Sequence, residues 1–211
     1  MKKLLFILFF LPLIGFTQSM FKQKTELNQK TLIYSEESHF KNMRQLTFEG
    51  ENAEAYWSFD DSKLIFQATN ENWGQSCDQI YITDTNNYNL DVEMPNMVSL
   101  GMGRTTCSYF MPGDTTIIYA STHLQDAKCP HVPERRVDGK YVWPIYESYD
   151  IFIADLSGNV LKRLTNHQGY DAEATVSPKG DKIVFTSIRS GDLELYTCNI
   201  DGSDLKQVTD Q

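Results

Sequence analysis

The side chains that could support chemistry are spread along the chain and do not form a known catalytic motif. The four histidines, His39, His123, His131 and His167, lie far apart in the sequence. The chain contains no G-x-S-x-G nucleophile elbow, no P-loop, no H-E-x-x-H motif and no dinucleotide-binding fingerprint. We therefore predict no catalytic residue and no cofactor, and we expect a protein that is not an enzyme.

Two glutamates occupy equivalent places in a repeated pattern, which is described below. Glu54 and Glu173 each come before a predicted innermost strand, and Cys107 takes the same place in another copy. Together with Asp171, the two glutamates are candidate ligand-facing residues at the rim of a central channel, where carboxylates could bind a cation. The alternative is that these side chains only form hydrogen bonds that cap strands and loops.

An extra segment between Tyr119 and Asp150 supplies the other candidate ligand-facing residues. It holds three of the seven prolines, which disfavour regular structure. Long loops on a rigid scaffold often carry binding residues. The candidates are an aromatic platform and two anion contacts: Tyr141, Trp143, Tyr146, Arg135 and Arg136. The alternative is that the aromatic side chains only pin the loop to its sheet and the arginines are solvated.

The N-terminus has the layout of a secretory signal peptide over residues 1–17. Lys2 and Lys3 precede the apolar run Leu4–Ile14, and Gly15–Thr17 offers a small-residue cleavage site. The run is shorter than the ~20 residues that a membrane span needs. No cysteine lies near the cleavage site, so we expect no lipid anchor. The sequence predicts a periplasmic or secreted protein that does not span the membrane.

Export favours disulfides, because thiols are oxidised outside the cytoplasm. The candidates are Cys77, Cys107 and Cys129, and spacing alone leaves their pairing open. Cys198 lies in an apolar strand and has the character of a small core residue. The sequence Cys129-Pro130-His131, with His123 nearby, matches no closed four-ligand zinc pattern, so we predict no metal site.

Composition narrows the range of partners and of fold classes. The chain has 211 residues and a formal charge of −9, and the loss of Lys2 and Lys3 on export leaves it more acidic. An acidic chain is a poor match for nucleic-acid phosphates or for an anionic membrane surface. Hydrophobic residues make up 41% and aromatic residues 12%, which favours a folded chain rich in β-strands.

The chain repeats itself. The segments Ala55–Phe66, Ser108–Tyr119 and Ala174–Phe185 align without gaps, and each is typical of a strand, a tight turn and a second strand. A predicted third strand follows each copy, and a polar turn then leads to a short fourth strand. Successive copies end at Thr165 and Thr209, so one repeat takes ~44 residues, which is the size of a propeller blade.

The third copy carries a family resemblance. The run from Tyr170–Glu173 through Asp181–Phe185, closed by Asp201–Ser203 and Val208–Thr209, resembles the propeller repeats of the TolB family, also called WD-like repeats. The resemblance implies an all-β fold, a β-propeller of four-stranded antiparallel blades. The expected blades cover about 48–98, 103–165 and 169–209 within a propeller region at 43–211.

The segment before the repeats is expected to add an outer strand. Residues 18–42 contain the strand-like run Thr31–Tyr34, and Asn42–Thr47 matches the fourth-strand ending of the other copies. Only about three blades can be counted, whereas closed propellers have ~4–8. We therefore expect a partial or truncated ring, which further blades or a second chain would close.

Function follows from the resemblance rather than from a motif. TolB is a periplasmic component of the Tol–Pal envelope system, and its propeller binds a lipoprotein. The resemblance thus implies a non-catalytic exported module whose partner is a protein or an envelope polymer. Two alternatives stay open: the propeller part of a prolyl-oligopeptidase-type peptidase, and a metal-dependent propeller lyase.

Overall fold

The structure, a computed structural model, describes residues 34–85, 94–134, 136–140 and 142–210. The chain divides into two compact units, Met1–Phe48 and Glu49–Gln211. The described part of the first unit, residues 34–48, contains turns and irregular chain but no strand. The predicted signal peptide at 1–17 and the predicted strand residues Thr31–Ile33 lie outside the described residues.

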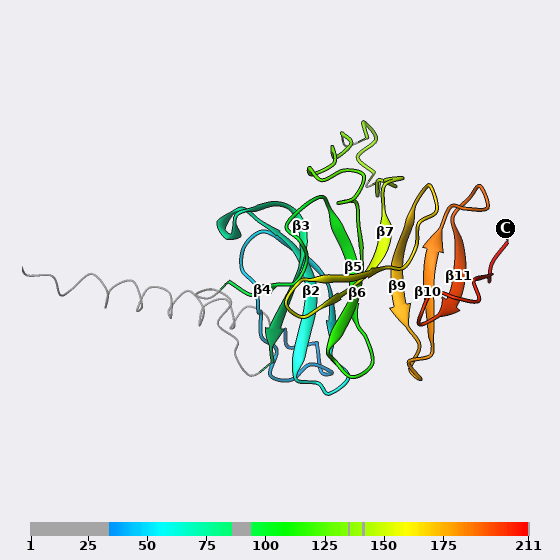
Figure 1. The fold of residues 1–211 in the computed structure, drawn as a ribbon. Coiled ribbons are helices and arrows are strands. Elements are labelled where there is room, and N and C mark those ends of the chain that lie inside the picture. Colours follow the sequence, from blue (N-terminus) through cyan, green and yellow to red (C-terminus); the bar gives the residue numbers. More distant parts are fainter. Residues whose placement is uncertain (1–33, 86–93, 135, 141, 211) are drawn as a thin grey trace, which may run out of the picture. The chain divides into compact units, whose positions relative to one another are not determined.

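The second unit contains three four-stranded antiparallel sheets, in each of which the strands pair in sequence order (Figure 1). Blade one comprises β1 (Glu51–Trp57), β2 (Lys63–Asn70), β3 (Gln75–Asp84) and β4 (Asn96–Met97). Blade two comprises β5 (Thr105–Phe110), β6 (Thr116–Ser121), β7 (Asp150–Asp155) and β8 (Val160–Arg163). Blade three comprises β9 (Asp171–Val176), β10 (Lys182–Ser187), β11 (Glu194–Asn199) and β12 (Lys206–Gln207). A short 3-10 helix, η1 (Glu71–Trp73), joins β2 to β3. The predicted all-β class with four-stranded antiparallel blades is confirmed.

Blade two is buried on both of its faces. Side chains alternate across a strand, so neighbours on β6 point to opposite sides. Ile117 and Tyr119 pack in a cluster with blade one residues such as Ile65. Ile118 packs instead with blade three residues such as Phe185. Because both faces of blade two are covered, its central strands β6 and β7 have no face toward solvent. This explains why their sequences are nearly continuous apolar runs.

The serine or threonine that ends each repeat accepts the same hydrogen bond in all three blades. The hydroxyl oxygens of Ser99, Thr165 and Thr209 each accept a hydrogen bond from a backbone N–H of the third strand in their own blade, at 2.8–2.9 Å. The hydroxyl satisfies a strand N–H just beyond the short fourth strand, where the backbone ladder stops. This contact accounts for the small hydroxyl residue at the same place in every copy.

In each blade a tight turn connects the first and second strands, and it contacts the same turn of the neighbouring blade. The two blade-to-blade contacts differ. At the first junction, the Asp114 carboxylate accepts from the backbone N–H groups of Phe59 and Asp60 at 2.9 and 3.0 Å. At the second junction, Gly180 occupies the place of Asp114 and lies against Pro112. A Cβ on Gly180 would be 2.4 Å from Pro112 Cγ, so only glycine fits there.

Each innermost strand contains one irregular residue at an equivalent position. Glu54 on β1, Cys107 on β5 and Glu173 on β9 all have left-handed backbone, with φ of 55°, 51° and 59°. The pairing register of all three strands shifts at this point, which is the signature of a β-bulge. The three positions that the repeat alignment made equivalent therefore share one backbone conformation.

Candidate functional site

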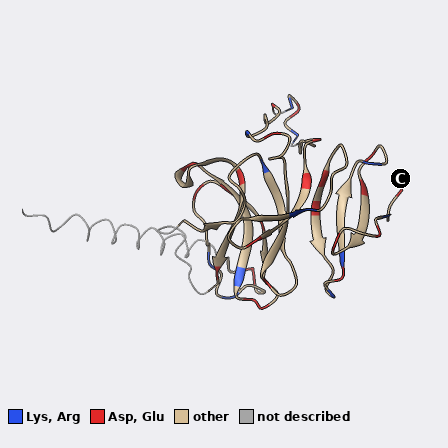
Figure 2. Cartoon of the chain, in the orientation of Figure 1, with Lys and Arg blue, Asp and Glu red and all other residues tan. Residues whose placement is uncertain are grey.

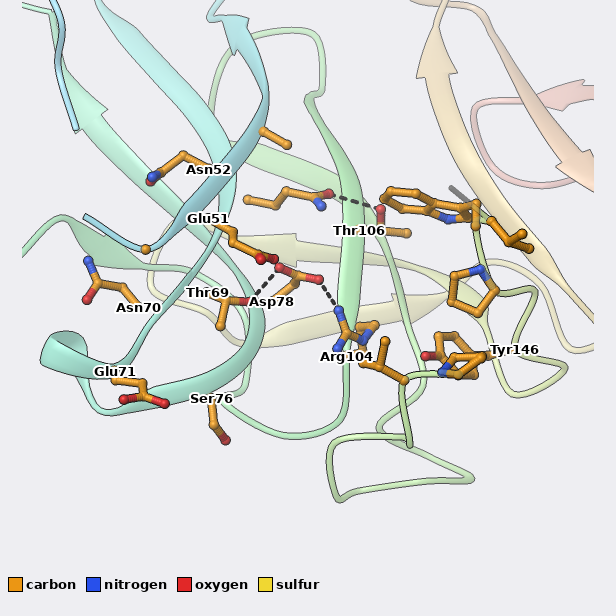
Figure 3. Close-up of a pocket in the computed structure, with 18 of the residues that line it drawn as sticks. Glu51, Asn52, Thr69, Asn70, Glu71, Ser76, Asp78, Arg104, Thr106 and Tyr146 are labelled. Atoms are coloured by element: carbon orange, nitrogen blue, oxygen red, sulfur yellow. Dashed lines mark hydrogen bonds and ion pairs between the residues drawn. The ribbon is translucent and has the colours of Figure 1, made fainter. Parts of the chain in front are cut away.

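A cleft of about 930 Å³ opens between the start of blade one and the extra segment of blade two. Figure 3 shows side chains from both sides of it. We call residues 122–149 the insertion; its described residues contain turns but no helix or strand. The cleft is the place where the insertion and the regular sheet meet, so it combines a rigid wall with a loop wall.

The rigid wall comes from blade one and is polar. It contains Glu49 and Glu51 at the start of β1, and Asn70 and Glu71 where β2 ends. Asn70 caps η1 by accepting from the Asn72 N–H at 2.9 Å, which holds this turn in place. The three glutamates are exposed to solvent. This wall thus presents carboxylates from a fixed backbone.

The floor of the cleft is a polar network that crosses from blade one to blade two. Thr69 on β2 donates its hydroxyl to Asp78 Oδ1 at 2.6 Å, and Asp78 is paired with Arg104, which lies just before β5. The Asp78 and Arg104 side chains are only 14% and 17% exposed. Nearby, the buried Thr106 donates to Gln67 Oε1 at 2.9 Å. These hydrogen bonds and this ion pair hold the floor in place, and none of them involves a glutamate of the rigid wall.

The loop wall is aromatic and prolyl, and a disulfide attaches the insertion to the sheet. Cys129 in the insertion is bonded to Cys77 on β3, with Cα atoms 5.6 Å apart. Trp143 lines the cleft and is 50% exposed. Tyr146 also lines it, and its hydroxyl donates to the His131 carbonyl at 3.0 Å. The Tyr146 ring also contacts the buried Tyr149, with ring centroids 6.0 Å apart.

Burial raises the pKa of both tyrosines at the cleft. The pKa of Tyr146 is raised, mainly by burial, and burial raises the pKa of Tyr149 further still. Both phenols are therefore neutral at physiological pH and act as aromatic surfaces with a hydrogen-bonding tip.

The cleft gathers some of the residues predicted from the sequence. Trp143, Tyr146 and Arg136 all line it, whereas Arg135 and Tyr141 lie outside the described residues. Arg136 is paired with Asp138 at 3.1 Å, and its side chain is 61% exposed. The predicted aromatic platform is therefore represented here by Trp143 and Tyr146, which face a polar wall that sequence reasoning did not anticipate.

Asp171 lies at the start of β9 and does not line the cleft. Its carboxylate is 1% exposed and receives two hydrogen bonds from Arg189, at 2.8 and 2.9 Å. The Arg189 guanidinium also lies over the Phe185 and Tyr196 rings, 5.2 and 4.9 Å from their centroids. Asp171 is thus a buried ion-pair partner inside blade three, because the arginine 18 residues later folds back onto it.

Glu54 and Glu173 are exposed at their bulges and make contacts within their own blades. Glu173 accepts from the Thr186 hydroxyl at 2.7 Å, and Glu54 accepts weakly from Tyr56 at 3.4 Å. Cys107 lies near both, since its pKa is raised to about 12 by burial first and then by the two glutamates. The thiol at this position is therefore protonated at physiological pH.

The cysteines separate into a bonded pair and two free thiols. Cys77 and Cys129 form the disulfide, and Cys107, which was a candidate for it, is free. Cys198 is also free and is buried in the core of blade three. Among the residues that the structure describes, no three histidine, cysteine or acidic side chains are placed to hold a metal ion.

Several cleft residues were missed from the sequence. Glu51, Thr69, Asp78 and Arg104 belong to no motif, and the ion pair joins residues 26 positions apart. In the sequence, the polar residues around η1 interrupt the alternation of apolar and polar residues in the first repeat, and this interruption was the available signal.

No helix in the described part of the chain is long and apolar enough to cross a membrane.

Comparison with known proteins starts from sequence. No family model matches the chain. It is 34% identical over 62 residues to an uncharacterized protein of Agrobacterium fabrum, a match that covers 29% of this chain and 21% of that protein. It is 40% identical over 47 residues to the Tol-Pal system protein TolB of Bordetella pertussis, covering 22% of this chain and 11% of TolB. The matches thus span a small part of these relatives.

Comparison of folds covers more of the chain. The structure superposes on that of a protein from Agrobacterium tumefaciens described as "putative TolB", with a TM-score of 0.51 and 20% identity, over 75% of this chain and 46% of that one. TolB of Acinetobacter baumannii gives a TM-score of 0.50 at 20% identity, over 77% of this chain and 33% of that one. These matches span less than half of either solved chain. Sequence and fold together confirm the resemblance: the described residues form three blades of a β-propeller similar in fold to TolB.

Proposed function

We propose that the chain is a non-catalytic, exported binding module that holds a protein or an envelope polymer in the cleft between blade one and the insertion. The observation that carries the proposal is the pairing of two unlike walls. One wall presents polar side chains from fixed strands, and the other presents the exposed Trp143 ring and the partly buried Tyr146 ring. Clefts of this size with a few placed polar groups are common ligand sites.

The disulfide supports both the binding role and export. A loop that must recognise a partner benefits from being held in its bound shape, because less conformational entropy is lost on binding. The Cys77–Cys129 bond holds the insertion against β3 in this way. Disulfides persist in oxidising compartments, which agrees with a periplasmic or secreted protein. TolB-like similarity supports the same kind of role, since the matched relative is a Tol-Pal system protein.

The test is co-sedimentation of the purified protein with isolated bacterial envelopes. The Trp143→Ala variant should lower the bound fraction, with an apparent Kd raised about tenfold, the cost expected for a central aromatic contact. Trp57→Ala is the matched control, because Trp57 is 52% exposed but does not line the cleft. Equal envelope binding by the wild type and Trp143→Ala, with both proteins folded, contradicts the proposal.

A further inference from the structure

We propose that the cleft takes an extended cationic peptide segment, with a Lys or Arg side chain of the partner placed against Glu51. This inference rests on the proposed function and names the ligand class of the same site. It follows from the charges of the two walls, the position of Glu51 and the exposed edge of β1.

The charges that line the cleft are unbalanced. The described lining residues include five carboxylates and three cationic side chains. Two of the cations have carboxylate partners, since Arg104 is paired with Asp78 and Arg136 with Asp138. The three glutamates Glu49, Glu51 and Glu71 all line the rigid wall. A potential of one sign in a cleft attracts a ligand of the opposite sign. The chain as a whole also carries 28 acidic against 19 basic residues, with acidic positions on all three blades (Figure 2).

Glu51 faces the charged floor of the cleft. It is the cross-strand partner of Thr69, and the Thr69 hydroxyl donates to Asp78. Cross-strand partners project from the same face of a sheet, so the Glu51 and Asp78 carboxylates point into one region. Figure 3 shows the Glu51 carboxylate directed toward Asp78 and the Arg104 guanidinium on the far side of Asp78. Two carboxylates therefore lie side by side here with one paired cation, Arg104, and a second cation beside Glu51 would balance the remaining negative charge.

The opposite wall suits the rest of such a side chain. Trp143 and Tyr146 line the cleft and present uncharged aromatic rings. Aromatic faces attract Lys and Arg cations and also pack against their methylene stems. A cationic residue between the two walls can thus meet a carboxylate on one side and an aromatic surface on the other.

The backbone of blade one favours a peptide over a glycan. β1 is the edge strand of its sheet, and Glu51–Ala53 at its start line the cleft. An edge strand has backbone N–H and C=O groups that can pair with an added strand. A neutral or anionic glycan that covered the glutamates of the rigid wall would remove water from them without supplying a counter-charge, which is costly.

The experiment measures binding of a fluorescein-labelled octapeptide of alternating Arg and Ala by fluorescence anisotropy. The comparator peptide has citrulline at each Arg position, so its shape is kept and its charge is lost. We expect the Arg peptide to bind at least about tenfold more tightly, and its affinity to fall as NaCl screens the charges. Equal affinity for the two peptides overturns the inference.

A matched pair of variants locates the binding. Glu51→Gln should raise the Kd of the Arg peptide about fivefold, since it removes one charge next to the bound cation. Asp192→Asn removes the same charge from an exposed residue in blade three and should leave the Kd unchanged. An equal effect of the two variants shows only a general attraction to an acidic protein and overturns the inference.

Two further outcomes keep this inference distinct from the proposed function. If chitohexaose binds and the Arg peptide does not, the cleft takes a glycan, so the peptide inference is wrong and the binding role stands. If the Arg peptide fails while Trp143→Ala still weakens envelope binding, again only the ligand class is wrong. If neither peptide nor envelope binding depends on the cleft, both proposals fail.

Discussion

Cys77 on β3 and Cys129 in the insertion are joined by a disulfide whose Cα atoms lie 5.6 Å apart, although 52 residues separate them in the sequence. Arg104 links the same two places, since it is paired with Asp78 and its Nη2 lies 3.7 Å from Cys129 Sγ. The covalent bond and the ion pair therefore hold the insertion and the cleft floor together.

Removing this disulfide should weaken the fold. A cross-link that closes a loop of this length is worth about 4 kcal/mol in the chain-entropy description. We expect the Cys77→Ser/Cys129→Ser double variant to unfold at a lower urea concentration than the wild type. Wild-type protein treated with a reducing agent should match the variant, and an unchanged urea midpoint in both would contradict the prediction.

The Asp171–Arg189 pair should contribute far more than the exposed ion pairs do. Asp171→Asn leaves the Arg189 guanidinium in a largely buried place without its counter-charge, and breaking such pairs costs about 3–5 kcal/mol. Asp204→Asn is the control, because its pair with Lys206 is exposed and should cost less than about 1 kcal/mol. Urea unfolding of both variants checks the order, and similar losses would show that the Asp171 pair has no special weight.

The free thiols should react slowly in the folded protein. Burial and two nearby glutamates raise the pKa of Cys107 to about 12, and burial raises the pKa of Cys198. For Cys107 the thiolate fraction at pH 8 is then at least about a hundredfold below that of an ordinary cysteine, and for Cys198 it is lowered as well. Iodoacetamide should add no mass to native protein within minutes, whereas denatured protein should gain two adducts. Rapid labelling of native Cys107 would rule out this environment.

Stability should fall as the pH drops below the ordinary histidine range. His123 is buried, its Nδ1 lies 2.9 Å from Ser121 Oγ, and its ring centroid lies 4.4 Å from that of Phe152. Burial, and then the Arg163 charge, lower its pKa in the folded state. The unfolded chain therefore binds more protons below pH ~6.5, so the contribution of His123 is complete above that pH and is lost below it.

The His123→Gln variant isolates this contribution. Asp150 acts in the opposite sense at more acidic pH, because burial raises its pKa. The interval from pH ~7 to pH ~5 spans the range in which a histidine of the unfolded chain titrates. Over this interval we expect the Tm of the wild type to fall more steeply than the Tm of the variant. Parallel Tm profiles would show that His123 does not titrate on unfolding.

The regular part of the fold was predictable from sequence, since its signals are local. The turn residues around Pro178 and Gly180 and the apolar run Ile183–Phe185 mark a strand–turn–strand unit without reference to the rest of the chain. The repeat then made Glu54, Cys107 and Glu173 equivalent, and the structure gives all three the same left-handed bulge.

The cleft was only partly predictable, because its geometry depends on contacts between distant segments. Trp143 and Tyr146 could be singled out as aromatic residues in a proline-rich loop, but nothing local places them opposite Glu51. Asp171 resembled a rim residue until its partner Arg189 was known. Pairings of this kind follow from the packing of complete blades, and a single sequence does not record them.

The two blade junctions have a consequence for how the repeats can be arranged. Phe59 and Asp60 offer backbone N–H groups and meet the acceptor Asp114, whereas Pro112 has no N–H and meets Gly180, which has no side chain. If the two turns were exchanged, a carboxylate would face a proline that cannot donate, and two N–H groups would lose their acceptor. A protein with its blades in another order would therefore lose stability at each contact between blades. The turn residues thus favour one order of the repeats.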